Sequence, residues 1–313
     1  LQNEIEEDCG VAFTGRITDK GKKEKVNLRK GFEADPMFLQ IWDKIKFHTK
    51  YSVNYETAEL ITLAAKAVKD MDETKKPSIR STKKKVVITD EGIEGQLLSD
   101  SGKDDYNYHI DMPDMLGYIQ SKTELTRSTI LEIIKKSGRI SEVLINPQLF
   151  MDNIVSSIRQ VLYALMIEGI KYEKIGGKIY EMKLFEDNEL EIYVDKFTHT
   201  VLQPDKTIYE NLIPLQSDVE SEFAKDCESS ENIEFYFKLP FWFKIQTPIG
   251  PYNPDWAIVF KDEKKIYFVA ETKSAGQELR GSEKLKIKCG KEHFNEFDDV
   301  VYKRVATVSE LSK

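Results

Sequence analysis

Residues 253–260 read NPDWAIVF, and residues 266–273 read IYFVAETK. Both runs are rich in β-branched and aromatic residues, which predicts two β-strands, and the charged run KDEKK at 261–265 predicts the hairpin between them. Side chains alternate along a strand, so Glu271 and Lys273 should project to the same face. The rest of the second strand is apolar on both faces, which is typical of a central strand that is covered on both sides.

Three charged groups end these two strands, namely Asp255, Glu271 and Lys273. Pro254 has a fixed φ and keeps the residue before it extended, so the Asp255 carboxylate should stand at a rigid strand start. Mg²⁺ prefers oxygen ligands and is often held by one or two carboxylates. Two carboxylates about 4 Å apart repel each other by roughly 4 kcal/mol at an effective dielectric near 20, which a cation between them would relieve. We therefore expect Asp255 and Glu271 to bind Mg²⁺.

This set of groups suits the hydrolysis of a phosphodiester, which needs an activated water and neutralisation of the charge that builds on the phosphate oxygens. Lys273 is expected to contact the scissile phosphate or to orient the attacking water. The alternative is that the three groups are ordinary charges at strand ends, since a bare Glu-x-Lys is weak evidence. The combination of Pro-Asp opening one strand and Glu-x-Lys closing the next favours a metal-dependent nuclease site.

A fourth acidic residue, Glu220, falls inside the apolar stripe of a helix predicted from Asp218 to Glu228. A carboxylate in such a stripe costs several kcal/mol if it has no partner. One explanation is that Glu220 belongs to the catalytic and metal-binding set. The other is structural, because Ser217 followed three residues later by Glu220 is also a capping box at a helix start.

The net charge of −8 does not favour a protein that binds DNA through its overall charge, so any DNA contact should be local. A helix-like segment follows Lys273, and four basic residues in it are candidates for contact with the phosphate backbone: Arg280, Lys284, Lys286 and Lys288. A solvated basic face is the alternative for each of them. His293 in the same segment is a minor candidate for a base, although a lone histidine beside Phe294 is more often structural.

Three widely spaced cysteines, Cys9, Cys227 and Cys289, argue against a zinc site and for reduced thiols in a cytoplasmic protein. No apolar run is long enough to span a bilayer, and the start of the chain has no signal-peptide pattern. The chain begins at Leu1, so we expect it to be a fragment of a longer protein.

The chain as a whole is predicted to have a mixed α/β fold in three regions, 1–85, 86–204 and 205–313. Upstream of residue 205, helices are expected near 36–45, 60–68, 112–121, 126–136 and 147–168, and strands at 51–55, 86–88 and within 170–194. Residues 75–85 are expected to be an exposed basic linker and residues 90–112 to be rich in loops. In the last region, strands are expected at 233–239, 241–246 and 300–308, in addition to the two at 253–260 and 266–273.

Several stretches of the last region resemble the restriction (Res) subunit of type III restriction-modification enzymes. These stretches are Lys238-Leu239-Pro240, Trp242-Phe243-Lys244-Ile245, Thr247-Pro248-Ile249-Gly250, Tyr252-Asn253-Pro254-Asp255-Trp256-Ala257 and Phe268-Val269-Ala270-Glu271-Thr272-Lys273. In that family the segment forms a C-terminal endonuclease domain of the PD-(D/E)xK fold, with a mixed central sheet flanked by helices. Residues 1–5 and 42–53 resemble the region that follows the helicase core.

The resemblance implies a Mg²⁺-dependent endonuclease that cuts double-stranded DNA together with a methyltransferase (Mod) subunit. It also implies an ATPase motor in the N-terminal part of the full-length chain, which would bind the ATP, and an isolated fragment with weak activity or none. Two alternatives stay open. The fragment could be an assembly module that docks the methyltransferase and the motor through residues 112–168, or a nuclease of the same fold that acts in DNA repair.

Overall fold

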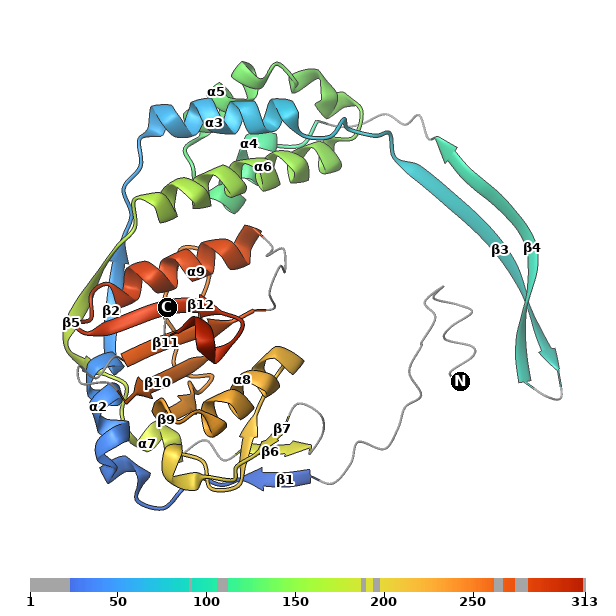
Figure 1. The fold of residues 1–313 in the computed structure, drawn as a ribbon. Helices are drawn as coiled ribbons and strands as arrows, with labels where there is room; N and C mark the ends of the chain where they lie inside the picture. Colours follow the sequence, from blue (N-terminus) through green and yellow to red (C-terminus); the bar gives the residue numbers. More distant parts are fainter. Residues whose placement is uncertain are drawn as a thin grey trace. The chain divides into compact units, whose positions relative to one another are not determined.

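The computed structural model describes residues 23–89, 92–105, 112–186, 190–193, 198–261, 267–273 and 281–311. The chain divides into two compact units (Figure 1), one made of residues up to 52 and from 171 onward, the other of Val53–Ile170. These units do not coincide with the three regions expected from the sequence. The difference arises because β2 (Phe47–Ser52) pairs with β5 (Lys171–Ile179), which joins the first segment to the C-terminal part.

A four-stranded mixed sheet forms the centre of the first unit. It contains β9 (Ile233–Lys238), β10 (Trp256–Phe260), β11 (Tyr267–Thr272) and β12 (Val300–Val305), in the order β12-β11-β10-β9. β10 is antiparallel to both β9 and β11, whereas β12 runs parallel to β11. The mixed α/β fold with a mixed central sheet is therefore confirmed, and β10 and β11 are neighbours, as predicted for the runs at 253–260 and 266–273.

Helices cover both faces of this sheet (Figure 1). On one face, α8 (Asp218–Ser229) packs Phe223 against Trp256 with ring centroids 5.6 Å apart. On the other, α2 (Pro36–Ile45) packs Phe38 against Phe237, and α9 (Gly281–Phe294) stacks Phe294 on Tyr302 at 5.7 Å. The β10 strand is buried throughout, which explains why its sequence is apolar on both faces.

The start of α2 follows from its sequence. Asp35 is the N-cap, and its carboxylate accepts a 2.8 Å hydrogen bond from the backbone N–H of Met37, while Pro36 occupies the first helical position. The apolar residues Phe38, Ile41, Trp42 and Ile45 recur at helical spacing and are all buried. The amphipathic pattern read from the sequence thus identifies the face that packs on the sheet.

Short elements complete the first unit. They are β1 (Lys23–Val26), η1 (Phe32–Ala34), α7 (Lys183–Glu186), β6 (Leu190–Tyr193), β7 (Thr198–Thr200), η3 (Pro204–Lys206), β8 (Leu212–Pro214) and η4 (Val308–Glu310). β1 pairs with β6 and β7 with β8, both antiparallel. The strand predicted at 51–55 is found earlier in the chain, as β2.

The strand predicted at 241–246 is wrong. The chain makes a turn there, in which the N–H of Phe243 donates to the carbonyl of Pro240, and only an isolated bridge joins Ile245 to Tyr252. The side-chain amide of Asn253 donates to the carbonyls of Pro240 and Phe243 at 3.2 and 2.8 Å. These carbonyls are therefore satisfied within the loop, which removes the need for a strand partner.

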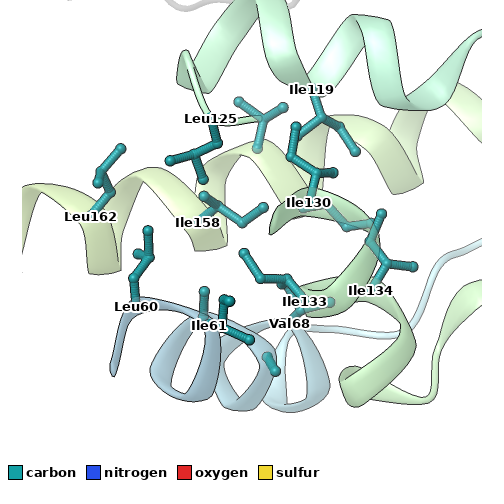
Figure 2. Packing of buried hydrophobic residues seen from close by; sticks show 14 of the residues in the cluster. Leu60, Ile61, Val68, Ile119, Leu125, Ile130, Ile133, Ile134, Ile158 and Leu162 are labelled. Atoms are coloured by element: carbon teal, nitrogen blue, oxygen red, sulfur yellow. The ribbon is translucent and has the colours of Figure 1, made fainter. Parts of the chain in front are cut away.

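The second unit is built from α3 (Thr57–Asp70), α4 (Met115–Thr123), α5 (Arg127–Ser137), η2 (Ile140–Leu144) and α6 (Pro147–Glu168). The three helices predicted at 112–121, 126–136 and 147–168 are confirmed to within three residues. Buried aliphatic side chains from all four α-helices form one core, which includes Leu60, Ile119, Ile133 and Ile158 (Figure 2). Because this unit has a core of its own, it has the internal packing of a separate domain.

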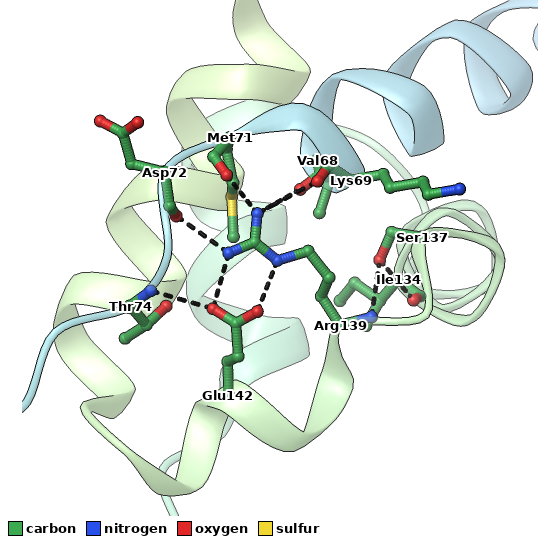
Figure 3. A network of polar contacts seen from close by, with 9 residues as sticks. All are labelled: Val68, Lys69, Met71, Asp72, Thr74, Ile134, Ser137, Arg139 and Glu142. Carbon is green, nitrogen blue, oxygen red and sulfur yellow. Dashed lines mark hydrogen bonds and ion pairs between the residues drawn. The ribbon is translucent and has the colours of Figure 1, made fainter.

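Arg139 and Glu142 anchor the end of α3 (Figure 3). The Arg139 guanidinium donates to the carbonyls of Val68, Lys69 and Met71, which are among those that a helix end leaves without a partner. Glu142 accepts from Arg139 at 2.5 and 2.7 Å and from the N–H of Thr74 at 3.0 Å. One ion pair therefore fixes the chain that leaves α3.

The linker expected at 75–85 and the loops expected at 90–112 are largely wrong. β3 (Ser78–Thr89) and β4 (Gly92–Asp105) form a long antiparallel ribbon, with a register that runs from Ser78 opposite Asp105 to Thr89 opposite Gly92. The prediction rested on composition, namely the basic residues of 75–85 and the glycines and aspartates of 90–112, but backbone hydrogen bonds can pair two strands whose side chains are polar. Across the described ranges, no helix is both long and apolar enough to cross a membrane.

Candidate active site

Glu271 lies near the end of β11 and is only 6% exposed. The hydroxyl of Tyr252 donates a 2.6 Å hydrogen bond to its Oε2, and the ammonium of Lys273 lies 3.2 Å from its Oε1. Glu271 and Lys273 are two positions apart on a strand, so the alternation of side chains brings them to the same side. The structure thus brings together two of the four candidate site residues.

Asp255 precedes β10 directly and is half-buried. Its backbone N–H donates to the carbonyl of Ala270 at 3.1 Å, which keeps the residue in the ladder between β10 and β11. Its Oδ2 accepts two hydrogen bonds of 2.8 Å, from the N–H and from the hydroxyl of Thr272. Trp256 opposes Ala270, so continuing the register by one residue places Asp255 beside Glu271.

The charges at these positions influence one another. Burial, followed by the charge of Asp255, raises the pKa of Glu271 to about 7, although the hydrogen bond from Tyr252 and the charge of Lys273 act the other way. For Lys273, burial alone would lower the pKa, but the carboxylates of Glu271, Asp255 and Glu283 together outweigh it and raise the pKa above its ordinary value. Lys273 is therefore a cation, and a further positive charge beside the two carboxylates would be favourable.

Two tyrosine hydroxyls extend the hydrogen bonding from Glu271, because Tyr252 contacts both Glu271 and Tyr302. The hydroxyls of Tyr252 and Tyr302 are 2.5 Å apart, and Tyr302 comes from β12. Gly290 of α9 allows both rings to come close, because a Cβ there would stand 2.6 Å from Cε1 of Tyr252 and 3.0 Å from Cζ of Tyr302. The glycine is therefore required by packing rather than by its backbone angles.

Glu220 does not join this set. Lys238 lies opposite Trp256 in the ladder, with its ammonium 5.5 Å from the centre of the Trp256 ring, so it stands on the face that α8 covers. It forms an ion pair with Glu220, and both side chains are nearly buried. Ala270 also opposes Trp256, so Glu271 projects to the other face of the sheet.

The hydrogen bonds of Glu220 explain why a carboxylate sits in an apolar stripe. Its N–H donates to the hydroxyl of Ser217 at 3.2 Å, and its Oε2 accepts from the N–H of Gln216 at 2.9 Å. This is a variant of the capping box, in which the returning bond reaches the residue before the N-cap. The assignment of Glu220 to the metal site is therefore not supported, and the structural explanation accounts for the residue.

Among the described residues, no group of three or more His, Cys, Asp or Glu side chains could hold a metal ion. Asp255 and Glu271 remain as two neighbouring carboxylates, the first half-buried and the second buried. Mg²⁺ is often held by one or two carboxylates, with water and substrate phosphates as its other ligands. The donor set and the repulsion between the two carboxylates fit such an ion.

The predicted basic residues fall on and before α9. Arg280 lies outside the described residues, and Lys284 and Lys288 are exposed one turn apart, with Lys291 exposed a turn further on. Lys286 is only half-exposed, and its ammonium donates to the carbonyl of Pro251 at 3.1 Å. Lys286 thus supports the loop that leads to Tyr252, whereas the other lysines form an open basic face.

His293 is 3% exposed, and burial lowers its pKa to about 3. Its Nδ1 lies 2.9 Å from the hydroxyl of Thr49, and the rings of Tyr172 and Phe297 lie 5.4 and 4.9 Å from its own. A histidine enclosed in this way is neutral and does not reach the carboxylates through any described hydrogen bond. The structural interpretation of His293 is therefore favoured.

The sequence did not single out Tyr252, Thr272 or Tyr302 as parts of the site. Side-chain alternation directs Thr272 away from the face of Glu271, but its backbone N–H at the end of β11 reaches Asp255 independently of that alternation. Tyr252 stands only three residues before Asp255, and an aromatic hydroxyl so close to a predicted ligand was a usable signal. Tyr302 is 50 residues away from Tyr252, so only the parallel pairing of β11 and β12 reveals its role.

Residues 205–308 match the model of a protein family described as "Endonuclease domain", of the restriction-endonuclease type. The match contains Asp255, Glu271 and Lys273 together with all four strands of the mixed sheet. It indicates an endonuclease domain in this part of the chain. Neither the curated proteins nor the solved structures include a match to the chain.

Proposed function

We propose that residues 205–308 carry a Mg²⁺-dependent endonuclease that hydrolyses phosphodiester bonds in double-stranded DNA. Asp255 and Glu271 are the proposed metal ligands, and Lys273 is the proposed contact to the scissile phosphate. The observation that carries the proposal is the buried Glu271–Lys273 pair beside Asp255, at the adjoining ends of β10 and β11. The match of the same residues to an endonuclease family supports it.

Each side chain has a separate task in this reaction. A bound Mg²⁺ would activate a water and neutralise charge on the phosphate. Lys273 is held as a cation by Glu271, and its side chain is 24% exposed, so its ammonium can donate to a phosphate oxygen. Removing one donor that stabilises a developing charge typically costs about 3 kcal/mol of the activation barrier.

The open face of α9 supports a DNA substrate. Lys284, Lys288 and Lys291 are exposed, and α9 is the helix that packs Gly290 against Tyr252. Lysines that contact phosphates supply affinity that does not depend on sequence. We propose that this face holds the DNA backbone near the two carboxylates, with Arg280 as a further contact.

We further propose that the chain is part of a type III restriction enzyme. The sequence resemblance to Res subunits supports this assignment, and it assigns site recognition to a methyltransferase subunit and ATP hydrolysis to an N-terminal motor. The net charge of −8 agrees with a nuclease whose affinity for DNA is partly supplied by its partners.

Cleavage of plasmid DNA tests the proposal. The full-length enzyme is assembled with its methyltransferase subunit and given Mg²⁺ and ATP, and Lys273→Ala and Asp255→Asn are compared with the unaltered enzyme. Both variants should lose at least a hundredfold in cleavage rate. Lys225→Ala is the matched control, because Lys225 is an exposed lysine on α8, on the opposite face of the sheet. Cleavage at the normal rate by Lys273→Ala and Asp255→Asn rules the proposal out.

A second candidate function is an assembly module in the unit Val53–Ile170. This unit has its own core, and three apolar side chains around η2, Ile140, Leu144 and Ile145, are 45%, 66% and 36% exposed. Co-purification with a methyltransferase subunit tests this role, with Leu144→Ser as the variant. Unchanged binding by Leu144→Ser and by a chain without residues 53–170 excludes it.

A further inference from the structure

Two segments of the chain carry the candidate site, one with Tyr252 and Asp255 and the other with Glu271 and Thr272. The hydrogen bonds at the site run from each segment to the other. Asp255 is held by Thr272, the residue directly after Glu271. Glu271 is held by Tyr252, three residues before Asp255. Each carboxylate is thus oriented by a residue from the segment that carries the other carboxylate.

We propose that Tyr252 and Thr272 are positioning residues, which orient the carboxylates of Glu271 and Asp255 for binding a divalent cation. This inference rests on the proposed function. A glutamate or aspartate side chain samples several rotamers, and ordering it costs free energy each time a ligand binds. Hydrogen bonds from a fixed neighbour meet that cost before the cation arrives.

The arrangement leaves oxygens for a ligand. Within the described part of the chain, both hydrogen bonds to Asp255 reach Oδ2, so Oδ1 is not engaged. On Glu271, Tyr252 occupies Oε2, and the partner of Oε1 among the described residues is the partly exposed Lys273. Among the contacts of the described residues, one oxygen of each acid therefore serves for orientation, and the other is available to a cation.

Tyr252 is itself held on two sides. Its hydroxyl lies 2.5 Å from that of Tyr302, and its ring packs against Gly290 of α9. Tyr252 is 5% exposed and Thr272 4% exposed, so water does not compete freely for either hydroxyl. A donor with so little freedom can define the position of its acceptor.

Binding of Mn²⁺ to the full chain tests the inference, followed by the electron paramagnetic resonance signal of the free ion. Tyr252→Phe keeps the ring and removes the hydroxyl, and it should weaken Mn²⁺ binding by about tenfold or more, as is typical for loss of a residue that orients a metal ligand. Thr272→Val should weaken it similarly, while Thr272→Ser should restore it because serine keeps the hydroxyl. Tyr302→Phe should have a smaller effect.

Tyr236→Phe is the control for loss of a buried tyrosine hydroxyl. Tyr236 is fully buried in β9, and its hydroxyl has no hydrogen-bond partner among the described residues. Thermal unfolding of every variant shows whether the fold is kept, and the Ser and Val pair at position 272 remains informative if Tyr252→Phe unfolds. Tyr236→Phe should bind Mn²⁺ like the unaltered chain.

The possible results separate the positioning role of Tyr252 and Thr272 from the proposed nuclease function. Suppose that Asp255→Ala abolishes Mn²⁺ binding while Tyr252→Phe and Thr272→Val bind normally. The positioning role is then wrong and the proposed function stands. If the unaltered chain binds no Mn²⁺ and the assembled enzyme cuts no DNA, both are wrong.

Discussion

Gly290 and Tyr252 approach each other so closely that a Cβ at position 290 would lie 2.6 Å from Cε1 of the tyrosine ring. Gly290→Ala must therefore displace Tyr252, Tyr302 or α9 itself. We expect a loss of about 1–3 kcal/mol in the free energy of unfolding, as is usual for an overfilled core, together with weaker Mn²⁺ binding. Gly281→Ala is the control, because a Cβ there meets nothing within 4 Å. Equal thermal stability of the two variants would contradict the packing argument.

The ion pair between Glu220 and Lys238 leads to a prediction that separates stability from catalysis. Their side chains are 8% and 12% exposed, and Lys238→Met leaves the Glu220 carboxylate buried without its cation. Loss of one partner of a buried pair costs about 3–5 kcal/mol, so chemical denaturation should show a large loss of stability. Glu220→Gln should bind Mn²⁺ with unchanged affinity, measured by the same resonance method. A hundredfold loss of affinity in Glu220→Gln would return this residue to the metal site.

Acid should weaken the unit Val53–Ile170 through Glu142. Its hydrogen bonds with Arg139 lower its pKa from 4.5 to about 2. A carboxyl whose pKa is lower in the folded state stabilises the fold at pH values above its unfolded pKa, and this contribution fades as the pH falls from about 4.5 towards 2. Glu142→Gln should therefore be less stable than the unaltered chain at pH 7 by about 2 kcal/mol, and the difference should shrink towards pH 2. Denaturant titrations across this pH range measure it, and a difference that is constant with pH refutes the assignment.

The exposed lysines of α9 should contribute to DNA affinity and to its dependence on salt concentration. Lys284→Ala and Lys288→Ala should each weaken binding to DNA of any sequence, and each should reduce the slope of log affinity against log salt by about one. Fluorescence anisotropy with a labelled duplex at several salt concentrations measures the slope. Lys225→Ala on α8 is the control and should leave it unchanged. Slopes that stay the same in the α9 variants would show that this face is merely solvated.

The central strands were predictable because burial on both faces leaves a direct trace in the sequence. The runs at 253–260 and 266–273 contain few residues other than apolar ones, and the structure forms β10 and β11 within them. The α-helices of the second unit were equally readable, since each has buried apolar residues at helical spacing, and α4, α5 and α6 also begin at a capping residue, such as Thr126 or Asn146. In these elements local preference and final packing agree.

The parts that could not be predicted depend on contacts between distant segments. The pairing of β2 with β5 joins residues more than a hundred positions apart, and no local pattern encodes that choice. The role of Glu220 was open for a similar reason, because its cation, Lys238, lies on another element. The β3–β4 ribbon was missed because lysines interrupt the apolar alternation on which strand prediction relies.

The pairing of β2 with β5 also shows where the chain passes between the two units. Ser52 and Lys171 are direct partners at the end of that ladder, so the polypeptide leaves the nuclease-bearing unit and re-enters it at one place. The unit Val53–Ile170 is thus inserted in the chain between β2 and β5, and a two-residue turn such as Asn-Gly could replace it. Conversely, an expression fragment that starts at residue 205 would lack α2 and β5, and it would expose to water the sheet face that α2 covers, which includes Phe237. A minimal nuclease should therefore be made by closing the hairpin rather than by trimming the N-terminus.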